Sequence, residues 1–155
     1  MPIYFAKNIW VNFKTWSLIM FLSILDNNEK EKFLNLVLNV GEVDGDFSDK
    51  EKSQILAYTL EMGISLKEKK EYNKSSKELI EFFSKSSKEV KKAILIEVIA
   101  LMLVDGMKTE EEALLNDMIQ VFDIDKQFKI DAIEWYKQML PLYKKGFELV
   151  GIGGL

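Results

Sequence analysis

The chain of 155 residues is 48% apolar and 30% charged, which suits a single domain with one contiguous core. It has no Cys, no His and no Arg, so thiolate and imidazole catalysis, Cys/His zinc sites and bidentate phosphate recognition are excluded. The formal charge of −4 argues against general nucleic-acid binding, and a bound metal would have to be Ca²⁺ or Mg²⁺, held by oxygen.

The amino-terminal residues 3–25 are rich in apolar and aromatic side chains, but Lys14 interrupts them. The uncharged run that follows Lys14 is shorter than the roughly 20 residues needed to span a bilayer. No basic start or small-residue cleavage site is present, so no signal peptide is expected. We expect a core helix preceded by an aromatic arm, residues 1–16. The alternative is an interfacial membrane anchor that contacts lipid through Trp10, Phe13 and Trp16.

Residues 17–148 have the apolar spacing of helices rather than of strands. Two successive helices each present one apolar face, made of Phe33, Leu36, Val37 and Val40 in the first and of Ile55, Leu56, Thr59 and Met62 in the second. Gly63 stands where the second helix would end. Residues 90–104 are apolar almost all round, which predicts a central helix.

The carboxyl-terminal part predicts one last long helix over residues 126–149, with a bend near Pro141. The glycines that follow have no helix after them, so they do not form a phosphate-binding loop. We expect residues 149–155 to be a flexible tail.

Helix starts are marked by the pattern Ser/Thr-x-x-Glu, in which the hydroxyl and the carboxylate cap each other's free backbone N–H groups. The pattern occurs at Ser48–Glu51, Ser65–Glu68, Ser75–Glu78, Ser86–Glu89 and Thr109–Glu112, and Asn28–Glu31 is a close variant. With the apolar spacing, it predicts an all-α, single-domain bundle of seven or eight short helices.

One signature occurs twice: Asp44, Gly45, Ser48 and Glu51 return 61 residues later as Asp105, Gly106, Thr109 and Glu112. Each copy consists of an apolar helix, an Asp-Gly turn, a hydroxyl cap and a Glu in the first turn of the next helix. Two such copies predict an internal pseudo-repeat of two helical hairpins packed around one core.

The acidic residues of these turns have two interpretations. Turn chemistry explains them all, because Gly takes left-handed conformations, Asp accepts local hydrogen bonds and Glu completes a capping box. Carboxylates at the negative end of a helix are unfavourable, however, and a bound cation would offset that repulsion. An EF-hand is excluded, since Asp49 stands where that loop needs Gly. The spacing supports at most a weak Ca²⁺ or Mg²⁺ site, with these candidate ligands: Asp44, Asp46, Glu51, Asp105 and Glu112.

Two segments, KFLNLVLNVGEVDGDFSDKE and ILIEVIALMLVDGMKTEEE, resemble the TerB-like family named for tellurite resistance, and the resemblance covers residues 17–148. It implies an all-helical, pseudo-symmetric bundle whose acidic turns bind a divalent metal and contact partners in stress-response complexes at the inner face of the membrane. The ligands that it implies are Asp44, Glu51, Asp105 and Glu112. Met107 and Lys108 replace acidic or small residues in the second copy, which makes that copy the weaker candidate.

We expect a non-enzymatic, cytoplasmic interaction module whose acidic turns bind a divalent cation or a basic protein partner. The alternative is a membrane-surface adaptor that inserts Trp10, Phe13 and Trp16. An enzyme is the least favoured class, since every acid singled out has a capping or turn role. The Lys-rich segment 66–92 also contains Glu and Ser throughout, which is typical of a solvated helix face rather than of a nucleic-acid contact.

Overall fold

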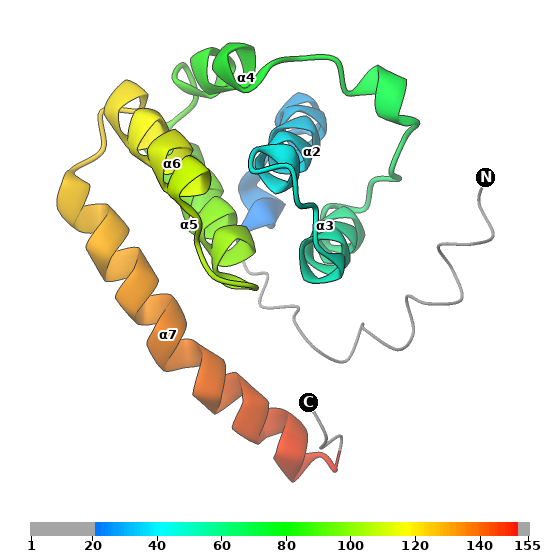
Figure 1. Cartoon of the computed structure of the whole chain (residues 1–155), viewed down its shortest axis with the longest axis vertical. Helices are drawn as coiled ribbons and strands as arrows, with labels where there is room; N and C mark the ends of the chain where they lie inside the picture. The colour runs from blue at the N-terminus through cyan, green and yellow to red at the C-terminus, as the bar shows by residue number, and fades with distance from the viewer. Residues whose placement is uncertain (1–20, 152–155) are drawn as a thin grey trace.

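The computed structural model of the chain describes residues 21–151. In this range the chain forms six α-helices and two short 3₁₀-helices and no strand (Figure 1). The elements are η1 (Leu22–Ile24), α2 (Asn27–Glu42), α3 (Asp49–Met62), η2 (Lys69–Glu71), α4 (Ser76–Phe83), α5 (Lys88–Leu103), α6 (Thr109–Val121) and α7 (Lys126–Leu149). The predicted all-α class is confirmed, although the six α-helices are fewer than the seven or eight expected.

Helix α5 is the centre of the bundle, as its sequence predicts. It contacts α2, α3, α6 and α7, and its buried side chains point in every direction around the helix axis. The predicted face of α2 is confirmed, since all four of its apolar residues are completely buried. The predicted face of α3 is buried except at Leu56, which is half-buried, and Gly63 ends this helix with a left-handed φ of 65°.

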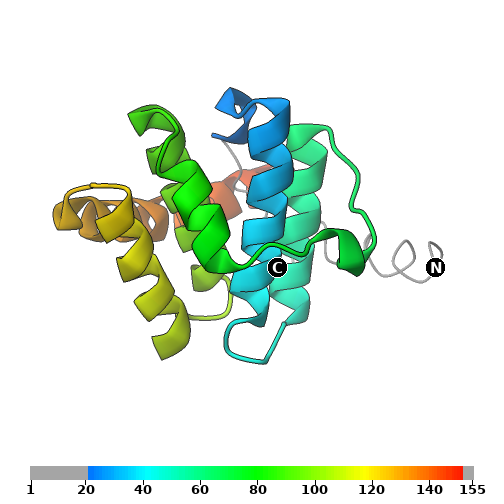
Figure 2. The ribbon, with the colours of Figure 1, turned by 90° about the horizontal axis from the view of Figure 1, so that it is seen from above.

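The two helical hairpins of the predicted repeat are α2–α3 and α5–α6. The turns that join them lie at the same end of the bundle (Figure 2). An apolar side chain fixes each turn to the core, Phe47 in the first hairpin and Met107 in the second. The Phe47 ring lies directly over Gly41 of α2, where even a methyl group would approach the ring to 2.5 Å. The first turn therefore packs onto α2 because residue 41 has no side chain.

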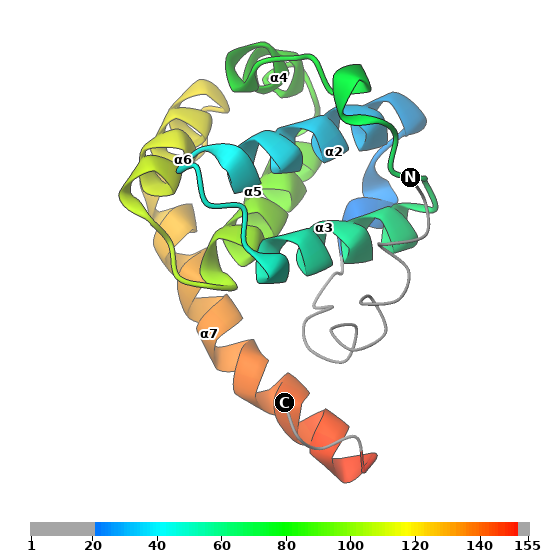
Figure 3. The same cartoon turned by 45° about the vertical axis from the view of Figure 1, so that its right-hand side comes forward.

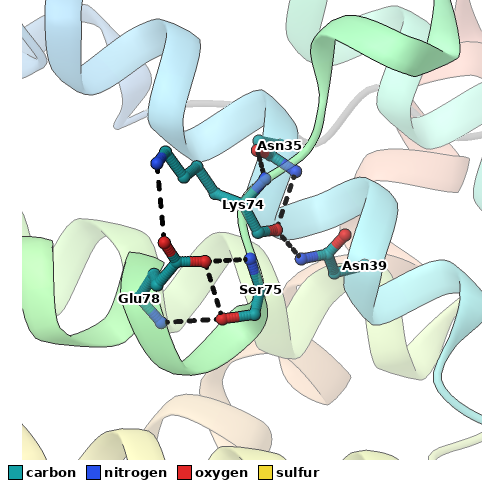
Figure 4. A network of polar contacts seen from close by, with 5 residues as sticks. All are labelled: Asn35, Asn39, Lys74, Ser75 and Glu78. Atoms are coloured by element: carbon teal, nitrogen blue, oxygen red, sulfur yellow. Dashed lines mark hydrogen bonds and ion pairs between the residues drawn. The ribbon is translucent and has the colours of Figure 1, made fainter.

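Two predicted capping boxes are confirmed, at Ser48–Glu51 and at Ser75–Glu78. The second box starts α4 and is part of a larger polar network (Figure 4). In this network Asn35 of α2 accepts the backbone N–H of Lys74 at 3.1 Å, and Asn39 donates to the Lys74 carbonyl at 2.9 Å. These bonds tie the long connection before α4 to the side of α2.

Three other predicted starts are wrong: Ser65–Glu68, Ser86–Glu89 and the variant Asn28–Glu31. Ser65 precedes no helix, because the chain is irregular from the end of α3 to η2, which explains the lower helix count. The other two helices begin one or two residues away from the prediction. Ser87 accepts the N–H of Val90 at 3.2 Å, and Asp26 forms a complete capping box with Glu29.

Helix α7 is a single helix that contains Pro141 in its interior. Its first half packs against α5 through Ala132 and Tyr136, and its second half extends beyond the other helices (Figure 3). None of the helices between residues 21 and 151 is long and apolar enough to cross a membrane. The proposed lipid contacts Trp10, Phe13 and Trp16 lie outside the described residues, as do the whole arm, residues 1–16, and most of the expected tail.

The contact between residue 41 and Phe47 yields a stability prediction. Gly41→Ala should lower the free energy of unfolding by about 1–3 kcal/mol, because the added methyl group displaces the Phe47 ring from its packed position. Thermal unfolding followed by circular dichroism measures the change. Gly146→Ala is the matched control, since apart from the backbone of α7 itself and the adjacent residues no atom lies within 4 Å of its added methyl group. It should raise stability by about 0.5–1 kcal/mol. Equal effects of the two substitutions would contradict the packing role of Gly41.

Candidate cation site at the paired Asp-Gly turns

The two Asp-Gly turns meet in space. Lys108 Nζ of the second turn lies 2.5 Å from Asp44 Oδ2 of the first turn and 3.6 Å from Asp105 Oδ2 of its own turn. One ammonium group therefore bridges the two copies of the repeated signature. We call this group of side chains the acidic centre; it consists of Asp44, Glu51, Asp105, Lys108 and Glu111.

The first turn is built by local hydrogen bonds around Gly45, whose φ of 80° favours glycine. Asp44 Oδ1 accepts the backbone N–H of Asp46 at 2.9 Å. Ser48 Oγ accepts the N–H of Glu51 at 3.2 Å, and Glu51 Oε2 accepts the N–H of Ser48 at 2.8 Å. The capping box thus uses one oxygen of a completely buried carboxylate and leaves the other facing the interior.

The second turn is one residue shorter than the first, and this shifts the capping position. The N-cap of α6 is Lys108, not Thr109, and its backbone N–H donates to Glu111 Oε2 at 2.9 Å. Lys has no acceptor atom, so its side chain returns no hydrogen bond and the box is only half formed. The predicted box Thr109–Glu112 is therefore wrong, and Glu111 is the true counterpart of Glu51.

The remaining candidate ligands from the sequence lie outside the acidic centre. Glu112 is exposed on α6 and forms an ion pair with Lys129 of α7, at 2.6 Å from its Nζ. Asp46 is also exposed and contributes only its backbone N–H to Asp44. Of the five predicted ligands, the structure brings together Asp44, Glu51 and Asp105.

Three carboxylate oxygens of the acidic centre are buried and accept no hydrogen bond: Glu51 Oε1, Asp105 Oδ1 and Glu111 Oε1. Both glutamates are completely shielded from solvent. Buried polar atoms normally have a partner, since an unpaired one costs about 1–3 kcal/mol. The acidic centre therefore contains three acceptor atoms whose burial without a partner is unfavourable.

The charges of the centre affect one another. Burial raises the pKa of Glu111 to about 7, and the nearby Glu51 and Asp105 carboxylates add to the increase. Burial likewise raises the pKa of Glu51. The hydrogen bond between Lys108 and Asp44 has the opposite effect on the acid, because it lowers the pKa of Asp44 and raises that of Lys108. The centre thus holds more acid groups than its single ammonium can neutralise.

The donor atoms of this centre fit a hard cation, because Ca²⁺ and Mg²⁺ prefer carboxylate oxygen. The arrangement of these donor atoms does not fit one. Among residues 21–151, no three acidic side chains are placed so as to hold a metal ion together. The positive charge nearest to Asp44 and Asp105 is instead the Lys108 ammonium.

A second pair of acids, which the sequence did not reveal as functional, lies at the start of the described chain. Glu61 accepts the backbone N–H of Leu22 at 3.1 Å, and Glu97 accepts that of Phe21 at 3.2 Å. These bonds fix η1 against α3 and α5. Glu97 is the only acid in the apolar run 90–104. An acid that stands alone among apolar residues was the feature of the sequence that could have indicated its structural role.

Comparison with known proteins supports the fold. The sequence matches no protein-family model and no curated protein. The crystal structure of a tellurite resistance protein from Nostoc punctiforme is similar to this chain, with a TM-score of 0.60 at 19% sequence identity. The similarity covers 100% of this chain and 98% of the other. The chain has the TerB-like fold. The resemblance of the two acidic segments is thus confirmed at the level of the fold.

The raised pKa of Glu111 yields a pH prediction. The folded state holds this proton up to about pH 7, whereas the unfolded chain releases it near 4.5, so folding stability falls as the pH rises between these values. Glu111→Gln removes this loss of folding stability, because Gln has no proton to release in this pH range. The variant should gain on the order of 2 kcal/mol relative to the wild type between pH 4 and pH 8.

Chemical denaturation at both pH values, with a chelator present, measures the two free energies of unfolding. Glu112→Gln is the matched control, since it makes the same substitution at the neighbouring exposed position of α6. A Glu111→Gln effect that is the same at both pH values would contradict the raised pKa.

Proposed function

We propose that this protein is a non-enzymatic binding module whose acidic centre binds a cation. The cation is either a divalent ion, Ca²⁺ or Mg²⁺, or the amino group of a basic protein partner. The observation that supports this proposal is the set of three buried carboxylate oxygens without a hydrogen-bond partner, in acids that interact electrostatically with one another and with the single ammonium of Lys108. An additional positive charge would satisfy these oxygens and offset the repulsion between the acids.

Binding accounts for the acidic centre better than catalysis does. One oxygen of each glutamate accepts a helix-capping hydrogen bond from a backbone N–H, and one oxygen of Asp44 accepts a backbone N–H within its own turn. A general acid or base needs a substrate within hydrogen-bond reach, whereas these groups are enclosed between two turns. The chain also lacks the histidine and cysteine that most often carry such chemistry.

The biological setting is part of the same proposal, and the fold similarity supports it. The Nostoc punctiforme structure is described as that of a tellurite resistance protein. We place this chain in a comparable stress-response role, in the cytoplasm and in contact with a protein partner rather than with nucleic acid. Peripheral contact with the inner face of the membrane, through the aromatic arm, is the alternative.

Calorimetric titration with Ca²⁺ and with Mg²⁺ tests the proposal. The wild type should bind weakly, with a dissociation constant of about 10⁻⁴–10⁻³ M, as in other oxygen-ligand sites of modest charge. The double variant Asp44→Asn with Asp105→Asn should lose at least about tenfold in affinity, because it removes two charges from the acidic centre.

The matched control is Asp46→Asn with Glu112→Gln, which removes the same total charge from exposed positions outside the centre. Its affinity should stay within about twofold of the wild type, because exposed charges are screened by salt. Absence of heat and of any melting-temperature shift in the wild type would refute divalent-ion binding. Equal losses of affinity in both double variants would show that overall charge, and not the acidic centre, is responsible for binding.

A further inference from the structure

We propose that the amino-terminal segment, residues 1–20, docks on an exposed apolar face of α7 in the same chain. We call this face the outer stripe; it consists of Leu142, Tyr143, Leu149 and Val150. The inference concerns different residues from those of the acidic centre and does not depend on cation binding.

Large apolar side chains are concentrated on the outer half of α7. Ten such side chains are exposed in the described chain, and four of them lie between residues 142 and 150. Leu142, Leu149 and Val150 have exposed fractions of 71%, 80% and 73%. Residues seven positions apart on a helix lie on the same side, so the four side chains form one continuous face. A contiguous apolar face is typical of an interaction site, whereas single exposed side chains are not.

The outer stripe continues the face through which the first half of α7 packs on the bundle. Ala132, Trp135, Met139 and Leu142 follow one another at alternating intervals of three and four residues, and Leu149 is seven residues further on. This spacing is typical of a helix that packs along one partner. The first half of α7 packs against α5, and the second half extends beyond the other helices (Figure 3). The pattern therefore predicts a further partner for the second half.

The point where the chain enters the described structure indicates which partner this is. The ring of Phe21 packs on that of Trp135, with the two ring centroids 5.9 Å apart. The backbone N–H of Phe21 also donates to Glu97 Oε1 of α5 at 3.2 Å. These two contacts hold Phe21 beside the middle of α7. Residues 1–20 are therefore joined to the structure at the place where the outer stripe begins.

The length of the amino-terminal segment fits the outer stripe. Val150 is 15 residues beyond Trp135, which is about 22 Å along a helix. A helix of 20 residues is about 30 Å long and an extended chain is longer, so residues 1–20 can reach the whole stripe. A segment tethered next to its site has an effective concentration in the millimolar range, so even a weak contact is occupied. A second copy of the chain or a lipid surface lacks this advantage.

The apolar pattern of the segment also fits. Its sequence has the same alternating intervals of three and four residues, at Ala6, Ile9, Phe13, Trp16 and Met20. Helix α7 leads away from Trp135, whereas the segment leads toward Phe21, so the two would run antiparallel. Phe13 is eight residues before Phe21, and Leu142 is seven residues after Trp135. Docking therefore places Phe13 opposite Leu142.

Disulfide cross-linking in the whole chain tests the docking, because the sequence contains no Cys. Phe13→Cys with Leu142→Cys should form an intramolecular disulfide under mild oxidation. Phe13→Cys with Ile130→Cys is the matched control, since Ile130 is 56% exposed on another side of α7 and is also close to Trp135 in sequence. The first pair should cross-link at least about tenfold faster, because both pairs share the tether and only the first has the docked contact.

Thiol reactivity provides a second measurement. The thiol of Leu142→Cys should react with a maleimide several-fold faster when Phe13→Asp and Trp16→Asp are added, because the two charges prevent apolar docking. The thiol of Ile130→Cys should react at the same rate with and without these substitutions.

Three results would overturn the proposal. Equal cross-linking of both cysteine pairs, with thiol reactivity unchanged by the aspartates, would show that the segment does not dock. A disulfide that joins two chains would assign the outer stripe to a second copy. Flotation of the chain with phosphatidylserine vesicles, with no intramolecular disulfide in their absence, would assign the segment to lipid.

Discussion

The ion pair between Lys108 and Asp44 is the contact on which the site geometry depends. It joins two turns that are far apart in the sequence, and it does so at the place where four acids would otherwise repel one another. Without a positive charge at this point, Asp44 and Asp105 would be left beside two buried glutamates. The acidic residues therefore require a positive charge close to them, and the Lys108 ammonium supplies it.

The rest of the bundle supports this contact. Helix α5 supplies a core that both hairpins share, and the apolar residues Phe47 and Met107 fix the two turns to that core. The capping hydrogen bonds of Glu51 and Glu111 then hold the start of α3 and of α6 against the end of the Asp-Gly turn that precedes each helix. Packing thus determines where the turns lie, and electrostatics determines what can lie between them.

Much of this fold could be predicted from the sequence, because its signals are local. The apolar period of α2 is long and regular, and the serines at 48 and 75 stand directly before their helices, so these features were found correctly. The start of α6 was misplaced because the repeat was aligned on its Asp-Gly pair. An alignment on the apolar anchors Phe47 and Met107 would have matched Glu51 with Glu111 and revealed the shorter turn. The meeting of the two turns had no local signal, since it depends on how the hairpins pack around α5.

The second Asp-Gly turn is one residue shorter than the first, and this difference does more than shift the position of the capping residues. Two turns of equal length would have placed a hydroxyl cap, Ser48 or Thr109, at the start of each second helix. The deletion instead sets a lysine opposite the first turn, so the internal pseudo-symmetry of the helices is broken at the acids. The two copies of the repeat therefore share one ion pair and one group of acids, and neither copy has its own.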